Sequence, residues 1–233
     1  MTERTGMRPG WRGTALWLAL VAAAGCGGTG QRQGVDDDVR EQVAEQLAEQ
    51  GRDGAAEVVR DRAETTVEQL DTPYLPTWSV FQFDQQAPSG EIQHIVATDG
   101  QESLLLRAAP DAFVSVLRAD GVTVEDEALA IDLARDYLYM TRPTDVHAYL
   151  VEELDEIQLR TDATDADRAE LEERVGDVLA PARAQPSADG GYEVTAFVVS
   201  GNVLQRRVLT VADGTIDDEV EVLAEDLPVP FSR

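Results

Sequence analysis

Three β-rich runs near the C-terminus constrain the fold of this 233-residue chain more than any other feature. The runs cover residues 192–199, 203–211 and 216–223, and they are rich in β-branched, aromatic and other apolar residues. Their connections contain Gly201-Asn202 and Asp213-Gly214, pairs that favour tight hairpin turns. Because such short turns join antiparallel neighbours, the sequence predicts a three-stranded antiparallel meander.

A helix is predicted over residues 35–70. Apolar residues recur there at intervals of four, which places them on one helical face that we expect to pack on its own domain rather than on a partner helix: Val35, Val39, Val43 and Leu47. Acidic residues repeat at the same interval on the opposite side, which therefore belongs in solvent. Gly51 and Gly54 predict a kink or a split in this helix.

The middle of the chain contains further strands and helices. Strands are predicted at residues 78–83, 91–97 and 103–107. Helices are predicted at residues 110–119, 126–140 and 165–179, the last of them capped by Asp165. The segment 144–160 fits both a strand and a helix, and we favour a strand at 147–154.

A helix followed by an antiparallel meander thus occurs twice, which predicts an α+β fold in two parts, residues 35–122 and residues 123–233. This order of elements is similar to that of small cystatin-like or PepSY-like modules. The resemblance is one of architecture, and it adds one function to consider, a PepSY-like inhibitor or modulator of an envelope protease.

The N-terminus has the three parts of an export signal. Arg4, Arg8 and Arg12 form a positive region, and an uncharged apolar run follows at residues 15–24. Ten apolar residues are too few to cross a bilayer as a helix, which needs about 20. Residues 1–25 are therefore predicted to be a signal peptide and not a permanent membrane span.

The end of this segment, Ala23-Ala24-Gly25-Cys26, resembles the lipobox of bacterial lipoproteins, although that family usually has Leu where Ala23 stands. The resemblance implies that the Cys26 thiol receives a diacylglycerol, that the chain is cut between Gly25 and Cys26, and that the new amine is acylated. Gly27 then fits sorting to the outer membrane or the cell surface rather than retention in the inner membrane. The alternative is an ordinary secretory peptide, which would leave the only cysteine of the chain as a free thiol. Residues 26–34 are predicted to be a flexible tether.

The charge of the chain excludes one class of partner. It has 45 acidic residues against 19 basic ones, a formal net charge of -26, and every basic residue is Arg. Such a surface repels phosphate backbones, so we expect no nucleic-acid binding.

Candidates for catalysis are few. The chain has two histidines, His94 and His147, each beside apolar residues, and we expect both to be structural. No motif of a serine hydrolase, zinc protease, P-loop or dinucleotide-binding protein is present in the sequence. Carboxylates are too abundant for an acid pair to be singled out.

Two acidic clusters resemble calcium ligands in composition but lack the spacing of an EF-hand. They are residues 36–38 and a group made of Asp162, Asp165, Asp167 and Glu170. We expect the second cluster to cap a helix, and we expect neither a metal nor a cofactor.

The sequence therefore predicts a lipid-anchored cell-envelope protein without catalytic activity, in a binding, scaffold or assembly role with an envelope protein as partner. The alternatives are the protease modulator named above and an anchored hydrolase that uses acidic residues on a cell-wall or polysaccharide substrate. Two close buried carboxylates in a cleft would favour the hydrolase, and an exposed apolar patch would favour binding.

Overall fold

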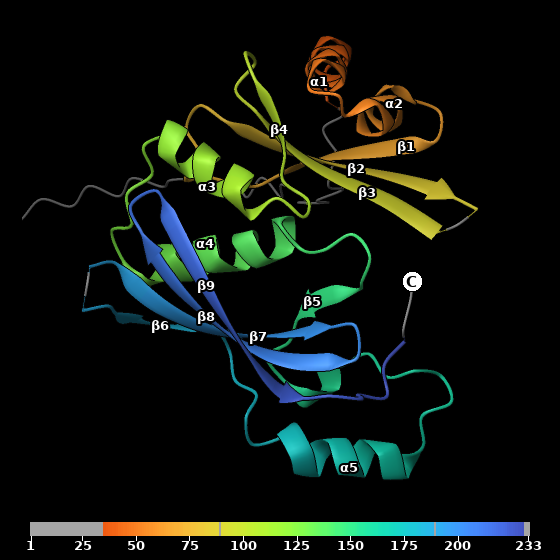
Figure 1. The fold of residues 1–233 in the computed structure, drawn as a ribbon, viewed down its shortest axis with the longest axis vertical. Helices are drawn as coiled ribbons and strands as arrows, with labels where there is room; N and C mark the ends of the chain where they lie inside the picture. The colour runs from red at the N-terminus through yellow and green to blue at the C-terminus, as the bar shows by residue number, and fades with distance from the viewer. Residues whose placement is uncertain (1–34, 89, 189, 231–233) are drawn as a thin grey trace, which may run out of the picture. The chain divides into compact units, whose positions relative to one another are not determined.

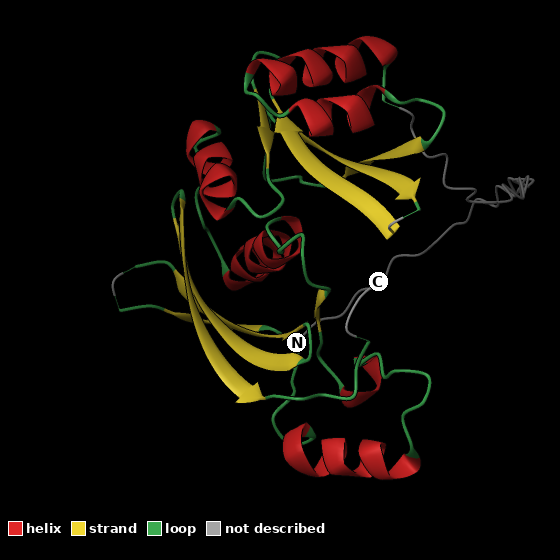
Figure 2. Cartoon of the chain, turned by 45° about the vertical axis from the view of Figure 1, so that its right-hand side comes forward, coloured by secondary structure: helices red, strands yellow, loops and turns green. Residues whose placement is uncertain are grey.

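The computed structural model describes residues 35–88, 90–188 and 190–230. These residues form an α+β fold with two antiparallel sheets and helices packed on them (Figure 1 and Figure 2). The signal segment, Cys26 and the tether lie outside the described residues. None of the helices in the described part of the chain is long and apolar enough to cross a membrane.

The predicted N-terminal helix is two helices, α1 (Asp37–Glu49) and α2 (Asp53–Arg60), followed by a strand. The split at Gly51 is confirmed, and this residue has a φ of 72°, which a glycine adopts without strain. The prediction was wrong beyond residue 60, because β1 (Thr65–Leu70) is a strand. Its first residues, Thr65-Thr66-Val67, are all β-branched and favour an extended chain.

Buried Arg40 fixes the turn between α2 and β1. Its guanidinium donates to the carbonyl oxygens of Val59, Asp61 and Thr65, the last two at 3.0 and 3.3 Å. The guanidinium also lies 5.9 Å from the centre of the Phe83 ring. One long side chain on α1 thus satisfies carbonyl groups where the helix stops and the strand begins.

The first sheet is a meander of four strands in sequence order. After β1 come β2 (Ser79–Ala87), β3 (Gly90–Thr98) and β4 (Ser103–Leu105), which confirms the three strands predicted here, although β4 is shorter than expected. The pairs are antiparallel, with Phe83 opposite His94 and Asp84 opposite Gln93.

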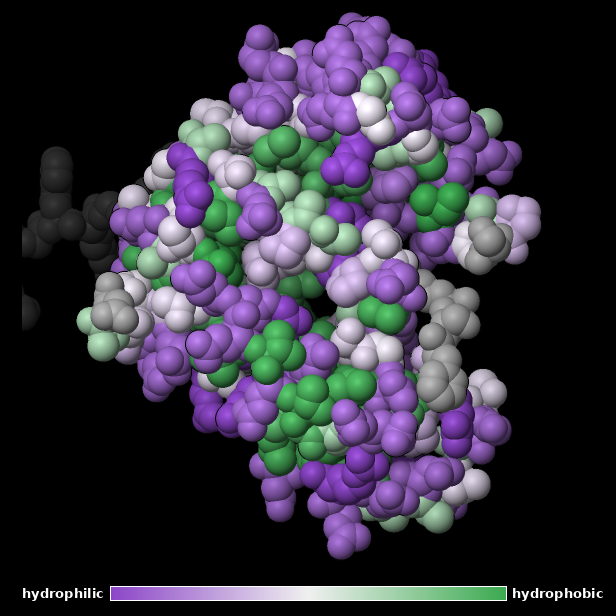
Figure 3. Space-filling view, in the orientation of Figure 1, coloured by the Kyte–Doolittle hydropathy of each residue, from purple (hydrophilic) through white to green (hydrophobic). Residues whose placement is uncertain are grey.

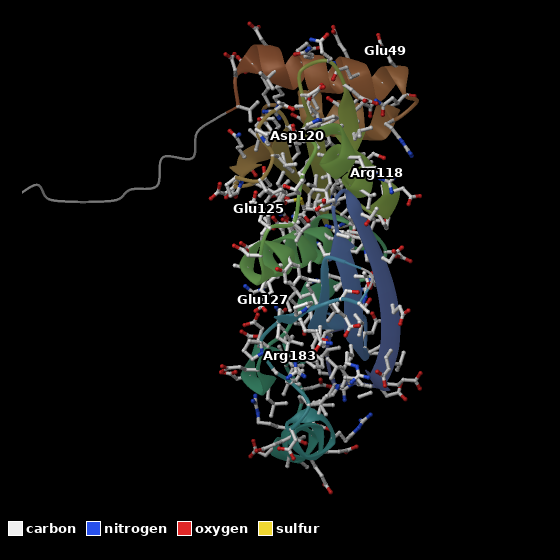
Figure 4. All side chains as sticks on the ribbon, turned by 90° about the vertical axis from the view of Figure 1, so that its left-hand side faces the viewer. Glu49, Arg118, Asp120, Glu125, Glu127 and Arg183 are labelled. Atoms are coloured by element: carbon white, nitrogen blue, oxygen red, sulfur yellow. The ribbon has the colours of Figure 1, made fainter. Side chains whose placement is uncertain are left out.

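Two helices follow the first sheet, α3 (Pro110–Ala119) and α4 (Glu127–Met140), at the predicted positions. Asp126 caps α4, since its carboxylate accepts from the Leu129 amide at 2.9 Å. Arg118, at the end of α3, reaches the turn before the last strand and donates from Nε to the Gly214 carbonyl at 2.9 Å (Figure 4).

The segment 144–160 contains a short strand, β5 (Ala148–Leu150), and a single 3-10 turn, η1 (Leu154–Glu156). Helix α5 (Asp165–Val175) ends before the predicted residue 179, because Gly176 and Asp177 are poor helix formers. Its cap is Thr164 rather than Asp165: the Thr164 hydroxyl accepts from the Asp167 amide at 3.2 Å, and the Asp167 carboxylate accepts from the Thr164 amide at 2.7 Å.

The second sheet contains the predicted C-terminal meander, β7 (Tyr192–Ser200), β8 (Val203–Ala212) and β9 (Thr215–Ala224). The prediction missed β6 (Arg183–Pro186), a polar strand without apolar alternation. The strands lie in the order β5-β7-β8-β9, and β6 also pairs with β7. Strands β5 and β6 lie along opposite ends of β7, while β9 is the outer strand on the other side.

The buried side chains group into layers. Helices α1 and α2 cover one face of the first sheet, as predicted for their apolar stripe. The central core contains Leu133 of α4 together with Ile95 of the first sheet and Val198 of the second, so α3 and α4 pack against both sheets. A third cluster places α5 on the far face of the second sheet. The central core therefore draws on residues from both sides of position 122, within one compact unit.

Candidate functional site

The two histidines considered from the sequence line one cavity of about 360 Å³. His94 lies on β3, and His147 lies just before β5, where its carbonyl accepts from the Gly201 amide at 2.9 Å. Arg107, which follows β4, lines the same cavity. Nothing in the sequence indicated that these residues meet, since 52 positions separate the histidines along the chain.

The surroundings of His94 on β3 favour the neutral form of its imidazole. Burial lowers its pKa, and the positive charge of Arg107 lowers the pKa further. The Nδ1 atom is buried and has no hydrogen-bond partner among the described residues. The imidazole is therefore neutral at pH 7.

A polar network beside the cavity fixes the first sheet to α4. The Gln93 side-chain oxygen accepts from both Arg107 and Arg142, and its amide nitrogen donates to Asp84 at 2.9 Å. The Arg142 guanidinium lies 4.1 Å from the centre of the Tyr139 ring on α4. Gln93 thus connects both arginines with Asp84 in one hydrogen-bond network, which favours a structural role for these side chains.

A half-buried carboxyl group on α4, that of Asp136, is the feature that sequence reasoning missed. The Tyr74 hydroxyl donates to Asp136 Oδ2 at 2.6 Å. Burial raises the pKa of Asp136 to about 6, the Tyr74 bond opposes this shift, and the negative charges of Asp132 and Asp71 add to it. One sign of it was visible in the sequence: Asp136 precedes Tyr137 and stands among apolar residues on the inward side of the helix.

We expect Asp136→Asn to stabilise the protein at pH 8 and to change its stability little at pH 4. The folded pKa lies above the ordinary value of 3.8, so ionisation costs the native state stability as the pH rises from about 4 to about 6. The neutral amide avoids this cost and still accepts from Tyr74, so the expected gain at pH 8 is about 1–3 kcal/mol. Thermal melting of both proteins at the two pH values measures it.

Asp132→Asn is the matched control, because Asp132 lies one turn away on the same helix and is exposed. Its effect should be a few tenths of a kcal/mol, as for exposed charges. A gain of equal size at pH 4 and pH 8 for Asp136→Asn would show that ionisation of Asp136 is not the cause.

In the described part of the chain, one residue of each acidic cluster takes part in capping a helix. Asp36 caps α1 by accepting from the Asp38 amide at 3.3 Å, and Asp167 belongs to the cap of α5 described above. Among the described residues, no group of three or more His, Cys, Asp or Glu side chains is placed to hold a metal ion.

The outer strand of the second sheet carries the most exposed large apolar side chains among the described residues. Val220 and Val222 of β9 are 53% and 51% exposed, against 41% for Val178 after α5. Figure 3 shows hydrophobic side chains gathered over the end of the second sheet where β9 finishes. The sequence predicted this strand, but its position at the edge of the sheet follows only from the strand order.

Successive side chains of β9 point to opposite faces, so Val220 and Val222 share one face while Glu219 and Glu221 share the other. All four are exposed, which leaves this stretch uncovered on both faces. Comparison of the chain with known protein families, with curated proteins and with solved structures finds no match.

Proposed function

We propose that the chain is a lipid-anchored cell-envelope protein whose role is docking to another protein, without catalysis. Its N-terminal sequence supports the anchor, since Cys26 stands where the lipobox places its acylated cysteine. The outer edge of β9 is the proposed docking surface. The observation that carries this proposal is the exposure of Val220 and Val222 on a strand whose outer edge pairs with no other strand of the described residues.

Exposed apolar residues on a sheet edge favour an added strand. The backbone groups along an edge are free to pair with another chain, and proteins usually keep apolar side chains away from such edges. Burying a valine stabilises a complex by about 1.5–2 kcal/mol before the costs of association. Two neighbouring valines together with backbone hydrogen bonds thus make an interface of the strand-addition kind.

The second candidate function is the anchored hydrolase, and the raised pKa of Asp136 is the observation that favours it. Asp136 is bonded to Tyr74, however, and neither residue lines the cavity beside His94 and His147. Docking is therefore the better supported of the two functions.

The test is a double variant, Val220→Lys with Val222→Lys, in the full chain. Positive charges on the apolar face of β9 should reduce capture of the docked protein by crosslinking in native membranes about tenfold or more, as loss of a central interface contact does. Val178→Lys is the matched control, because it adds a charge at another exposed valine. Equal capture by the double variant and the wild type would contradict docking at β9.

A further inference from the structure

We propose that β9 recognises a basic, extended segment of its partner, in which Arg or Lys residues are interspersed with apolar residues and which adds to the sheet as a further strand. This inference rests on the proposed docking function and names the chemistry of the docked segment.

The receiving edge is held in place at both ends. At its start, Gly214 accepts a hydrogen bond from Arg118 of α3, and Ile216 is buried in the central core. At its end, Ala224 and Leu227 are buried in the cluster between α5 and the second sheet. The exposed stretch between them, residues 219–222, is therefore ordered before a partner arrives, which lowers the entropy cost of docking.

The charges of β9 are only partly neutralised from the inner side. Its acidic residues are Asp217, Asp218, Glu219 and Glu221. Arg207 of β8 binds Asp218, with Nε 2.9 Å from Oδ1, and Arg206 of β8 binds Glu221. Asp217 and Glu219 form no ion pair with any arginine in the described part of the chain. The edge thus presents uncompensated negative charge to an incoming strand.

Strand β8 shows which sequence fits against β9, because it already pairs with the other side of the same strand. It places Arg206 opposite Glu221, Arg207 opposite Val220, and Val208 opposite Glu219. The two adjacent arginines of β8, within a strand that is otherwise mostly apolar, thus neutralise one carboxylate on each face of β9, Glu221 and Asp218. A strand added on the outer edge meets the same alternating side chains and so requires the same kind of sequence.

A second copy of this chain fits the edge poorly. In a symmetric antiparallel pairing centred on Val220, Glu219 of each copy faces Glu221 of the other, and like charges directly opposite are destabilising. Centring the pairing on Glu221 instead sets the Glu221 side chains of the two copies opposite each other, so like charges meet again. The partner is therefore a different, basic segment.

The test uses a fluorescent peptide with the sequence of β8, residues 203–212, and the full chain purified in a nonionic detergent. Fluorescence anisotropy should show saturable binding of this peptide. A second peptide, in which both positions corresponding to Arg206 and Arg207 carry Glu, should bind at least tenfold more weakly. Equal binding of the two peptides, or no binding of either, would overturn the proposal.

A charge reversal on the protein supplies the matching control. Glu219→Lys should weaken binding of the basic peptide about three- to fivefold and strengthen binding of the acidic one. Glu49→Lys changes the net charge equally on exposed helix α1 and should leave both affinities unchanged (Figure 4). If the two variants weaken the basic peptide equally, attraction to the whole acidic protein is the cause and the proposal is wrong. If crosslinking supports docking at β9 but the peptides show no charge preference, only this inference fails.

Discussion

Replacing Cys26 by Ala is expected to abolish lipid attachment and to leave the full-length chain uncut. Without the thiol there is no acceptor for the diacylglycerol, and the step that cuts between Gly25 and Cys26 acts on the lipidated form in the family that this segment resembles. Each buried methylene contributes about 0.8 kcal/mol to membrane attachment, so loss of two or more acyl chains removes a stable anchor. Mass spectrometry of the protein's N-terminus measures both effects.

Thr29→Ala, in the predicted tether, is the control and should be processed and acylated as the wild type is. A wild-type protein with an unmodified Cys26, or with its N-terminus at another residue, would contradict the lipid anchor. Such a result would not affect docking at β9, which depends on the described fold.

The second large effect is expected for Leu133→Ala, which should destabilise both sheets together. Leu133 is fully buried in α4, in the core that contains residues of both sheets. The cavity left by the smaller side chain should lower the free energy of unfolding by about 2–5 kcal/mol. Chemical denaturation of the chain from Cys26 onward is followed by the fluorescence of Trp78, which directly precedes β2 and is buried in the central core. The other two tryptophans, Trp11 and Trp17, precede Cys26.

Circular dichroism follows the whole fold in the same experiment, and its midpoint should shift together with that of Trp78. The half-buried Leu154→Ala is the control, and it should cost about 1 kcal/mol or less, in keeping with its partial exposure. Two separate transitions, of which only one moves, would show that the sheets unfold independently.

Local patterns in the sequence were sufficient for most elements of the fold. The C-terminal meander followed from β-rich runs joined by glycine turns, and Gly201 and Gly214 have φ values of 58° and 62°, as tight turns require. Helix α4 followed from its apolar face, and Asp126, predicted as its first residue, is its cap in the structure. Turns, helices and helix caps depend on residues that are close together in the sequence, so the sequence alone is enough to predict them.

Features that depend on distant residues could not be predicted. Strand β1 follows α2 because Thr65 to Leu70 pair with β2, whereas the acidic repeat of the helices ends at Asp61 and does not show where the strand begins. Strand β6 forms because its backbone pairs with the edge of β7. Its own sequence is polar and therefore did not indicate a strand. The shared core around α4 is likewise a product of packing between segments far apart in the chain.

The candidate surface was partly predictable. The alternation of valine and glutamate from Glu219 to Val222 is visible in the sequence, but it is equally compatible with a central strand. Its exposure depends on the strand order, which leaves β9 at the edge. The raised pKa of Asp136 comes mainly from burial, which depends on packing by segments far away in the sequence, such as the one that holds Tyr74, 62 positions away.

The most direct test of the account is site-specific photocrosslinking from position 222 in native membranes. A photoreactive residue in place of Val222 should give one discrete adduct with a membrane-associated or envelope protein, and the same residue in place of Val178 should give none. The crosslinked segment of the partner, located by mass spectrometry, should be extended and basic. An adduct pattern that is the same from both positions, or no adduct from position 222, would contradict docking at β9.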